Sequence, residues 1–116
     1  MEIIRKKLKL QKEEFNKKHL LIINHLLPVQ MTNREAEVLA AFLALEGDLA
    51  KDPFSTTGRK IVMGKLGLKP GGLGNFIRDL KKKKLILETE EEELYLLPVL
   101  IPQEGRQLYQ FVLEVE

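Results

Sequence analysis

Basic side chains are concentrated in one stretch of this 116-residue chain, residues 55–85. The stretch holds nine cationic side chains and one carboxylate, that of Asp79, although the net charge of the whole chain is only +2. The cations are Arg59, Lys60, Lys65, Lys69, Arg78 and Lys81–Lys84. Lysine and arginine side chains can bind phosphate groups, and their concentration on a predicted helix-turn-helix is typical of proteins that bind double-stranded DNA.

The second helix of this pattern, expected from about residue 70 to residue 83, places polar groups opposite its apolar residues. Its predicted outward positions are Gly71, Gly72, Asn75, Arg78 and Lys82. In the major groove, asparagine can form two hydrogen bonds with adenine, and arginine can form two with guanine. Because such a helix enters the major groove, we expect Asn75 and Arg78 to contact bases.

Glycine recurs at the start of the same helix, at positions 71, 72 and 74. Each glycine costs on the order of 1 kcal/mol of helix stability relative to alanine. Two explanations are open. The glycines would let backbone amides approach phosphate closely. Alternatively, they loosen an irregular helix start or allow close packing against the first helix.

Seven basic side chains are candidates for holding phosphates. They are Arg59, Lys60, Lys65, Lys69, Lys81, Lys82 and Lys84. The run of four lysines at 81–84 has an alternative explanation, because cations in a last helical turn complement the helix dipole and can remain solvated. Arg59 and Lys60 fall in the first turn of their predicted helix, where cations oppose the dipole, and this favours a binding role.

Five carboxylates surround the tip of a predicted β-hairpin that follows the basic helix. They are Glu88 and Glu90–Glu93. Phosphate would repel these groups, so the hairpin either points away from DNA or binds a basic protein surface. A solvated turn is the simpler alternative. The second functional hypothesis is therefore a protein-interaction adaptor that uses this acidic hairpin and the acidic segment 86–116.

Catalytic and metal chemistry find little support in the sequence. The chain contains no cysteine, which excludes disulfides, thiolate metal sites and cysteine nucleophiles. His19 and His25 are six residues apart on one predicted helix, so they lie on different faces and cannot form a metal pair. Gly71–Gly74 lacks the lysine and serine or threonine of a phosphate-binding loop. We expect no enzyme, no cofactor and no metal site.

Hydrophobic periodicity and capping signals predict the elements that position these residues. A strand at 2–10, or alternatively the start of a helix, precedes a helix from about Lys12 to Leu27. A capping box at Thr32 and Glu35 opens a helix to about Leu45. Ser55 opens the next helix, and Gly67 and Pro70 form the turn before the basic helix. The hairpin pairs 85–87 with 94–97, and a strand at 107–115 is expected to pair with 2–10.

This order of elements predicts an α+β, mainly helical fold with a winged helix-turn-helix. Residues 31–39, Met-Thr-Asn-Arg-Glu-Ala-Glu-Val-Leu, resemble the opening of the first DNA-binding helix of LuxR-type and MarR-type regulators. The later hairpin and the loop at 46–55 favour the winged, MarR-like version. The resemblance covers about residues 31–98. The whole chain also resembles small winged-helix proteins encoded by bacteriophages, through Leu27-Pro28, Thr57–Lys60 and Gly71–Asn75.

The length predicts a single domain over residues 1–116, with an N-terminal extension at 1–30, a winged-helix core at 31–98 and a C-terminal strand at 99–116. The apolar run at 20–29 is too short to span a bilayer, and residues 1–7 do not form a signal peptide, so we expect a cytoplasmic protein. A regulator, or a replication or packaging accessory, would fit. The N-terminal helix either forms a homodimer interface or covers the protein's own core.

Overall fold

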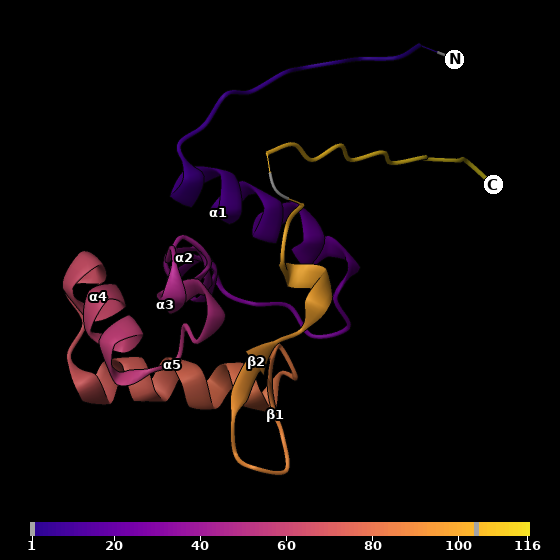
Figure 1. Cartoon of the computed structure of the whole chain (residues 1–116). Helices are drawn as coiled ribbons and strands as arrows, with labels where there is room; N and C mark the ends of the chain where they lie inside the picture. The colour runs from indigo at the N-terminus through magenta and orange to yellow at the C-terminus, as the bar shows by residue number, and fades with distance from the viewer. Residues whose placement is uncertain (1, 104) are drawn as a thin grey trace.

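The computed structural model describes residues 2–103 and 105–116 and has an α+β fold (Figure 1). Five α-helices and two short 3-10 helices accompany a two-stranded antiparallel sheet in these residues. The elements are α1 (Lys12–Ile23), η1 (Asn24–Leu26), α2 (Asn33–Leu43), α3 (Asp48–Lys51), α4 (Thr56–Leu66), α5 (Pro70–Lys82), β1 (Ile86–Glu88), β2 (Leu94–Leu96) and η2 (Pro98–Leu100). The predicted class is confirmed at this level.

Helix α2 is the centre of the fold, with α1 on one side and α4 and α5 on the other (Figure 1). Its Ala36, Val38, Leu39 and Phe42 are buried, and the ring of Phe42 lies 4.6 Å from that of Phe54 between centroids. Burying one large apolar side chain stabilises a fold by about 1.5–3 kcal/mol. The continuous apolar surface of α2 therefore explains why the other helices assemble around it.

Local capping signals set the helix starts as predicted. The Glu35 backbone amide donates to Thr32 Oγ1 at 3.1 Å, and the Thr32 amide donates to Glu35 Oε1 at 2.7 Å. These two bonds form the expected capping box. The Gly58 amide donates to Ser55 Oγ at 3.2 Å at the start of α4. Each cap satisfies amides that the first helical turn leaves without a partner.

The turn between α4 and α5 also has the predicted geometry. Gly67 has φ 65°, a left-handed conformation that glycine adopts without strain. The Leu68 amide then donates to the Met63 carbonyl oxygen at 3.0 Å. Pro70 occupies the first turn of α5, where its missing amide hydrogen costs nothing.

The hairpin that follows α5 pairs Ile86 with Leu96 and Glu88 with Leu94. Residues 89–93 connect the two strands, and within this loop the Glu92 amide donates to the Thr89 carbonyl oxygen at 3.0 Å. Ile86 and Leu96 are buried, so one end of the hairpin is fixed to the core. The acidic tip projects away from the helices (Figure 1).

The buried face of α1 agrees only in part with the face that helical spacing predicts, which is Phe15, His19, Ile22, Ile23, Leu26 and Leu27. His19 and Ile23 are buried as predicted, but Phe15, Ile22 and Leu27 are only half-buried and Leu26 is 65% exposed. Asn16 and Leu20 are buried without having been predicted. The α-helix ends at Ile23, and η1 tightens the backbone after it. The predicted helix to Leu27 was thus too long, and its predicted face was correct only at His19 and Ile23.

Two predicted strands do not form. Residues 2–10 and 105–116 have no regular secondary structure and no strand pairing, so their predicted pairing was wrong. Two isolated strands are marginally stable in water, and here no third strand is available. The sequence also did not predict α3, which occupies the expected loop at 46–55, or η2 after Pro98.

Candidate nucleic-acid interface

Four of the predicted site residues lie along one exposed face of α5. Gly71, Asn75, Arg78 and Lys82 are all exposed. Leu73, Ile77 and Leu80 are buried on the opposite face, and this anchors the helix. The spacing of three and four residues aligns the exposed positions along the helix. Helix α5 thus presents one amide and two cationic side chains together to solvent.

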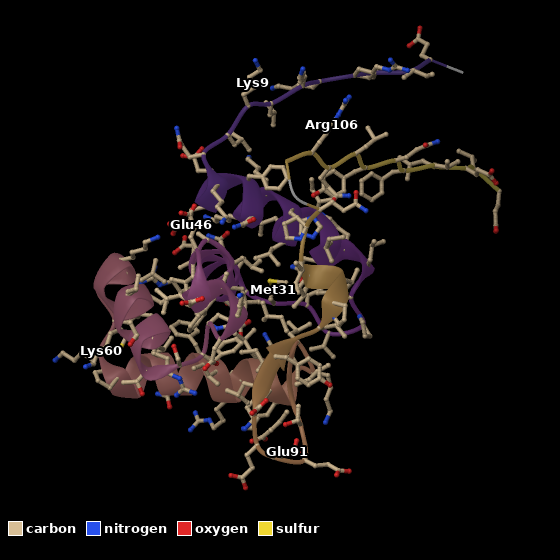
Figure 2. All side chains as sticks on the ribbon, viewed as in Figure 1. Lys9, Met31, Glu46, Lys60, Glu91 and Arg106 are labelled. Carbon is tan, nitrogen blue, oxygen red and sulfur yellow. The ribbon has the colours of Figure 1, made fainter. Side chains whose placement is uncertain are left out.

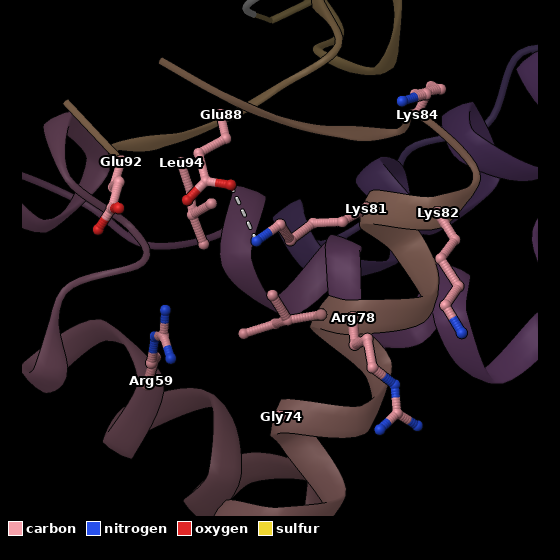
Figure 3. A pocket seen from close by; sticks show the side chains of 10 residues that line it. Arg59, Gly74, Arg78, Lys81, Lys82, Lys84, Glu88, Glu92 and Leu94 are labelled. Carbon is pink, nitrogen blue, oxygen red and sulfur yellow. Dashed lines mark ion pairs between the residues drawn. The ribbon is translucent and has the colours of Figure 1, made fainter. Parts of the chain in front are cut away.

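A groove runs between α5, the hairpin and the start of α4 (Figure 3). Charged side chains of both signs line this groove. They are Arg59, Arg78, Lys81, Lys82, Lys84, Glu88 and Glu92. Figure 3 shows Arg78 and Lys82 pointing away from the hairpin, whereas Arg59 projects from the start of α4 on the opposite side of the groove from Arg78. The hairpin therefore places its carboxylates beside one flank of the basic helix, and Arg78 and Lys82 face away from them.

Several of the predicted cations have carboxylate partners. Lys81 Nζ lies 3.0 Å from Glu88 Oε2, which ties the end of α5 to β1. Lys65 Nζ lies 3.5 Å from Glu13 Oε2. That contact directs Lys65 toward α1, so the structure does not bring it to the α5 face. Exposed ion pairs of this kind stabilise a protein by about 0–1 kcal/mol.

Lys83 is the one member of the four-lysine run that was not a candidate for DNA binding, and it lies at the edge of the core. Its Nζ lies 2.6 Å from Oε1 of the buried Glu35, the same carboxylate that caps α2. The ion pair therefore joins the end of α5 to the start of α2. Because removing one partner would leave a buried charge, this lysine has a structural role.

The other basic candidates have no carboxylate within ion-pair distance among the described residues. They are Arg59, Lys60, Lys69, Lys82 and Lys84. Arg59 Nε donates to the Phe54 carbonyl oxygen at 2.9 Å, which holds the guanidinium at the start of α4. Lys60 is exposed and extends into solvent beside it (Figure 2). Arg78 makes only a long contact, 3.8 Å from Nε to Asp79 Oδ1.

Close packing does not explain the glycines of α5. A Cβ at Gly71 or Gly74 would meet nothing within 4 Å, and one at Gly72 would only touch Leu68 Cδ2 at 4.0 Å. Gly58 provides the contrast, since a Cβ there would overlap the Pro53 carbonyl oxygen. The structure places Gly72 half-buried rather than outward. Gly71 and Gly74 thus expose backbone at a site where the fold would accept alanine.

Two residues beside the groove have unusual backbone conformations. Lys84 has φ 63° and Glu92 has φ 64°, and they are the only non-glycine residues with positive φ in the described part of the chain. Lys84 occupies the position after α5 where glycine is usual, because the Leu85 amide donates to the Leu80 carbonyl oxygen at 3.0 Å. Such conformations cost about 1–2 kcal/mol and cluster at functional sites.

The two histidines have different surroundings: His19 is buried and His25 is exposed. His19 is buried between Tyr109 and the backbone of Val99, and its Nε2 lies 3.2 Å from the Val99 carbonyl oxygen. Burial lowers the pKa of His19, and the hydrogen bond to Val99 opposes this only in part. His25 is exposed. In the described residues, no group of three or more histidine, aspartate or glutamate side chains is arranged to hold a metal ion.

Comparison of this chain with protein-family models, with curated proteins and with solved structures finds no match. Among the described residues, no helix is both long enough and apolar enough to cross a bilayer. The role of the surface must therefore be inferred from its geometry and charge. Sequence reasoning found the α5 face but did not predict that Glu88 and Glu92 line the groove beside it; the run of glutamates was the available signal.

Proposed function

We propose that the protein binds double-stranded DNA as a winged helix-turn-helix, with α5 in the major groove. The single observation that supports this most is the exposed face formed by Gly71, Asn75, Arg78 and Lys82. The width of the major groove admits one α-helix, and asparagine and arginine are suited to adenine and guanine edges. The protein would act by binding alone, in the cytoplasm, as a transcriptional regulator or a replication or packaging accessory.

Phosphate groups on the two sides of the DNA major groove would be held by the cations that lack carboxylate partners. Arg59 and Lys60 lie at the start of α4, Lys69 precedes α5, and Lys82 and Lys84 lie at its end. This arrangement places positive charge at both ends of the recognition helix. The backbone exposed at Gly71 and Gly74 would allow DNA to approach more closely than a side chain permits.

The acidic hairpin determines how the duplex can approach. Glu88 neutralises Lys81 and Glu92 lines the hairpin side of the groove, so phosphates are repelled from that flank. The duplex would therefore lie toward the flank of Arg78 and Lys82, where Asp79 Oδ1 is 3.8 Å from Arg78 Nε. Docking through a basic wing, which is common among winged helices, is not expected here.

The test is fluorescence anisotropy of a labelled random-sequence duplex, titrated with the protein at low and at near-physiological salt. We expect affinity to fall steeply with salt, because bound phosphates release counterions. Lys82→Ala should weaken binding and reduce the salt slope by about one. Lys18→Ala, which removes an exposed lysine from α1, is the matched control and should leave binding unchanged. Absence of binding at low salt would refute the proposal.

The roles of Asn75 and Arg78 can be separated from those of the phosphate contacts once a preferred site has been selected from random duplexes. Arg78→Ala should cost about 1–3 kcal/mol at the preferred site and relax the preference at one position. Lys82→Ala should weaken binding to all sequences alike. If both variants lose the same affinity on every sequence, Arg78 does not contact a base.

A protein-interaction adaptor is the second candidate, and the position of the hairpin favours it. The carboxylates of Glu88 and Glu92 interrupt the positive surface on one side, and Glu90 and Glu91 are exposed at the tip. A basic protein partner would bind there. The triple variant Glu90→Gln, Glu91→Gln, Glu92→Gln separates the two functions: DNA affinity should rise if DNA is the ligand, whereas an adaptor would lose its partner and gain no DNA affinity.

A further inference from the structure

The first residues of the chain form an exposed, basic arm. Residues 2–10, the N-terminal arm, have no regular secondary structure, and every residue from 2 to 9 is exposed. The arm contains one carboxylate, that of Glu2, and four cationic side chains. These are Arg5, Lys6, Lys7 and Lys9. The arm is therefore a second basic surface of the protein, distant in sequence from α5.

Nothing in the described part of the chain holds or neutralises the arm. Among the described residues, the arm makes no ion pair and no backbone hydrogen bond, and none of its apolar side chains belongs to the buried core. The acidic residues at the other end of the chain, Glu114 and Glu116, form no ion pair with it. The cations of the arm are thus available to a ligand, and its backbone is free to change direction.

Cations stand on both sides of the arm. In an extended chain successive side chains point in opposite directions, so Lys6 points away from Arg5 and Lys7. Ile4 and Leu8 share the side of Lys6, so the arm has no purely apolar side. A flat anionic surface would meet only one side of such an arm. The minor groove of DNA, about 6 Å wide, has phosphates along both walls and can contact both sides at once.

The arm begins close to the helices of the proposed DNA interface. Glu13, in the first turn of α1, has its Oε2 3.5 Å from Nζ of Lys65, which lies near the end of α4. Lys69, a proposed phosphate contact, follows Lys65 by four residues. The residues of the arm span about 30 Å when fully extended. From its root at α1, the arm can therefore reach DNA beside the turn between α4 and α5, although α1 and α5 lie on different sides of α2 (Figure 1).

We propose that the N-terminal arm lies in the minor groove of the duplex that α5 binds, with its cations on phosphates of both walls. The inference rests on the proposed function and adds a second element to the same DNA interface. An extended chain fits the minor groove, whereas an α-helix, about 10 Å across, does not. The arm raises affinity and adds little sequence preference, because base pairs are poorly distinguished in the minor groove.

The salt dependence of DNA binding tests the charges of the arm. The arm variant combines Lys6→Gln, Lys7→Gln and Lys9→Gln. In anisotropy titrations of a random-sequence duplex, it should reduce the slope of log affinity against log salt by about three, because each lost phosphate contact releases about one counterion fewer. An unchanged slope in the arm variant would overturn the inference.

A matched control separates the arm from the net charge of the protein. The control variant removes the same charge from exposed positions outside both basic surfaces, by Lys18→Gln, Lys51→Gln and Arg106→Gln. Its salt slope should equal that of the unmodified protein. An equal decrease of the slope in the two variants would show that net charge alone is responsible, and the inference would be wrong.

The position of the arm on DNA can be mapped directly, because the chain contains no cysteine and a single introduced thiol can be labelled. Ile3→Cys, at a position that is 69% exposed, would carry an iron–EDTA probe that cleaves the DNA backbone near it. On a duplex with the preferred site, cleavage should appear on both strands beside the base pairs contacted by α5. Val115→Cys, in the acidic segment 105–116 and 101% exposed, is the control and should give no localised cleavage.

Failure of this inference can be distinguished from failure of the proposed function. If the unmodified protein binds the duplex but the labelled Ile3→Cys variant cleaves no more locally than the control, the arm is not part of the interface, and binding by α5 stands. If the unmodified protein does not bind duplex DNA even at low salt, both proposals are refuted.

Discussion

At the scale of single residues, the proposed interface combines unneutralised cations with backbone strain. Lys82 and Lys84 are exposed and lack carboxylate partners among the described residues. Lys84 also occupies a left-handed position where glycine would be less costly. A lysine in that place does not improve the fold, so its charge is the property that the site can use. The same reasoning applies with opposite sign to Glu92 on the hairpin.

Replacement of Lys84 by glycine separates stability from binding. We expect Lys84→Gly to raise the free energy of unfolding by about 1 kcal/mol, because the left-handed conformation no longer strains a side chain. The same variant should bind duplex DNA more weakly, since one phosphate contact is lost. Urea denaturation and the anisotropy titration measure the two effects. Lower stability together with unchanged DNA binding would show that Lys84 supports the fold alone.

At the scale of elements, local signals proved predictable and distant pairing did not. The Thr32 capping box, the Ser55 cap and the Gly67 turn depend on contacts between near neighbours in sequence, and all three are present. The outward positions of α5 followed from its period, except Gly72. The strand at 107–115 was predicted from alternation and its pairing with 2–10 from opposite charges, and these patterns show that a segment can pair but not that it does.

The face of α1 was predicted only in part, for a related reason. Buried Asn16 contributes an amide group whose nitrogen has no hydrogen-bond partner among the described residues, so a hydrophobic pattern could not identify it. Leu26 was predicted to be inward because the α-helical period was continued past Ile23. It is exposed because η1 changes the helical period there. The positions of Glu88 and Glu92 beside α5 depend on hairpin docking, which involves residues distant in the chain.

The glycines of α5 give a prediction at the scale of the element. Gly74→Ala should stabilise the protein by up to about 1 kcal/mol, because the added methyl group meets open space in a helix. It should also weaken DNA binding if the backbone approaches the duplex there. Gly64→Ala in α4 is the matched control, since a Cβ at Gly64 also meets nothing within 4 Å.

Thermal unfolding and anisotropy would be measured for both glycine variants. The account requires a gain in stability for both and a loss of DNA affinity for Gly74→Ala alone. Unchanged affinity in Gly74→Ala would mean that close approach of the backbone is not needed at that position.

At the scale of the whole molecule, the segment at residues 105–116 is tied to the core through His19. The His19 ring in α1 contacts Tyr109 of that segment and the backbone of Val99 in η2, so one side chain joins three segments. Burial lowers the pKa of His19 below its ordinary value of 6.5. The folded state therefore favours the neutral ring, whereas the unfolded chain takes up a proton at higher pH.

This difference makes stability depend on pH in one direction. The contribution of His19 is fully present above about pH 6.5 and should be lost as pH falls through the lower pKa of the folded state. Urea denaturation at pH 8 and pH 5 should show a smaller free energy of unfolding at pH 5. His19→Gln, which does not titrate, should show a smaller decrease between these pH values. An equal decrease in both proteins would rule out His19 as the cause.

The most direct measurement is the two-dimensional ¹H–¹⁵N NMR spectrum of the ¹⁵N-labelled protein during titration with a short DNA duplex. The account predicts that the largest changes in backbone amide chemical shift occur at Gly71, Gly74, Asn75, Arg78 and Lys82, with smaller changes at the start of α4. Residues 90–93 of the hairpin should change little, because their carboxylates are repelled by phosphate. Shifts concentrated in the hairpin, or no shifts at low salt, would contradict the assignment of α5 as the DNA-binding element.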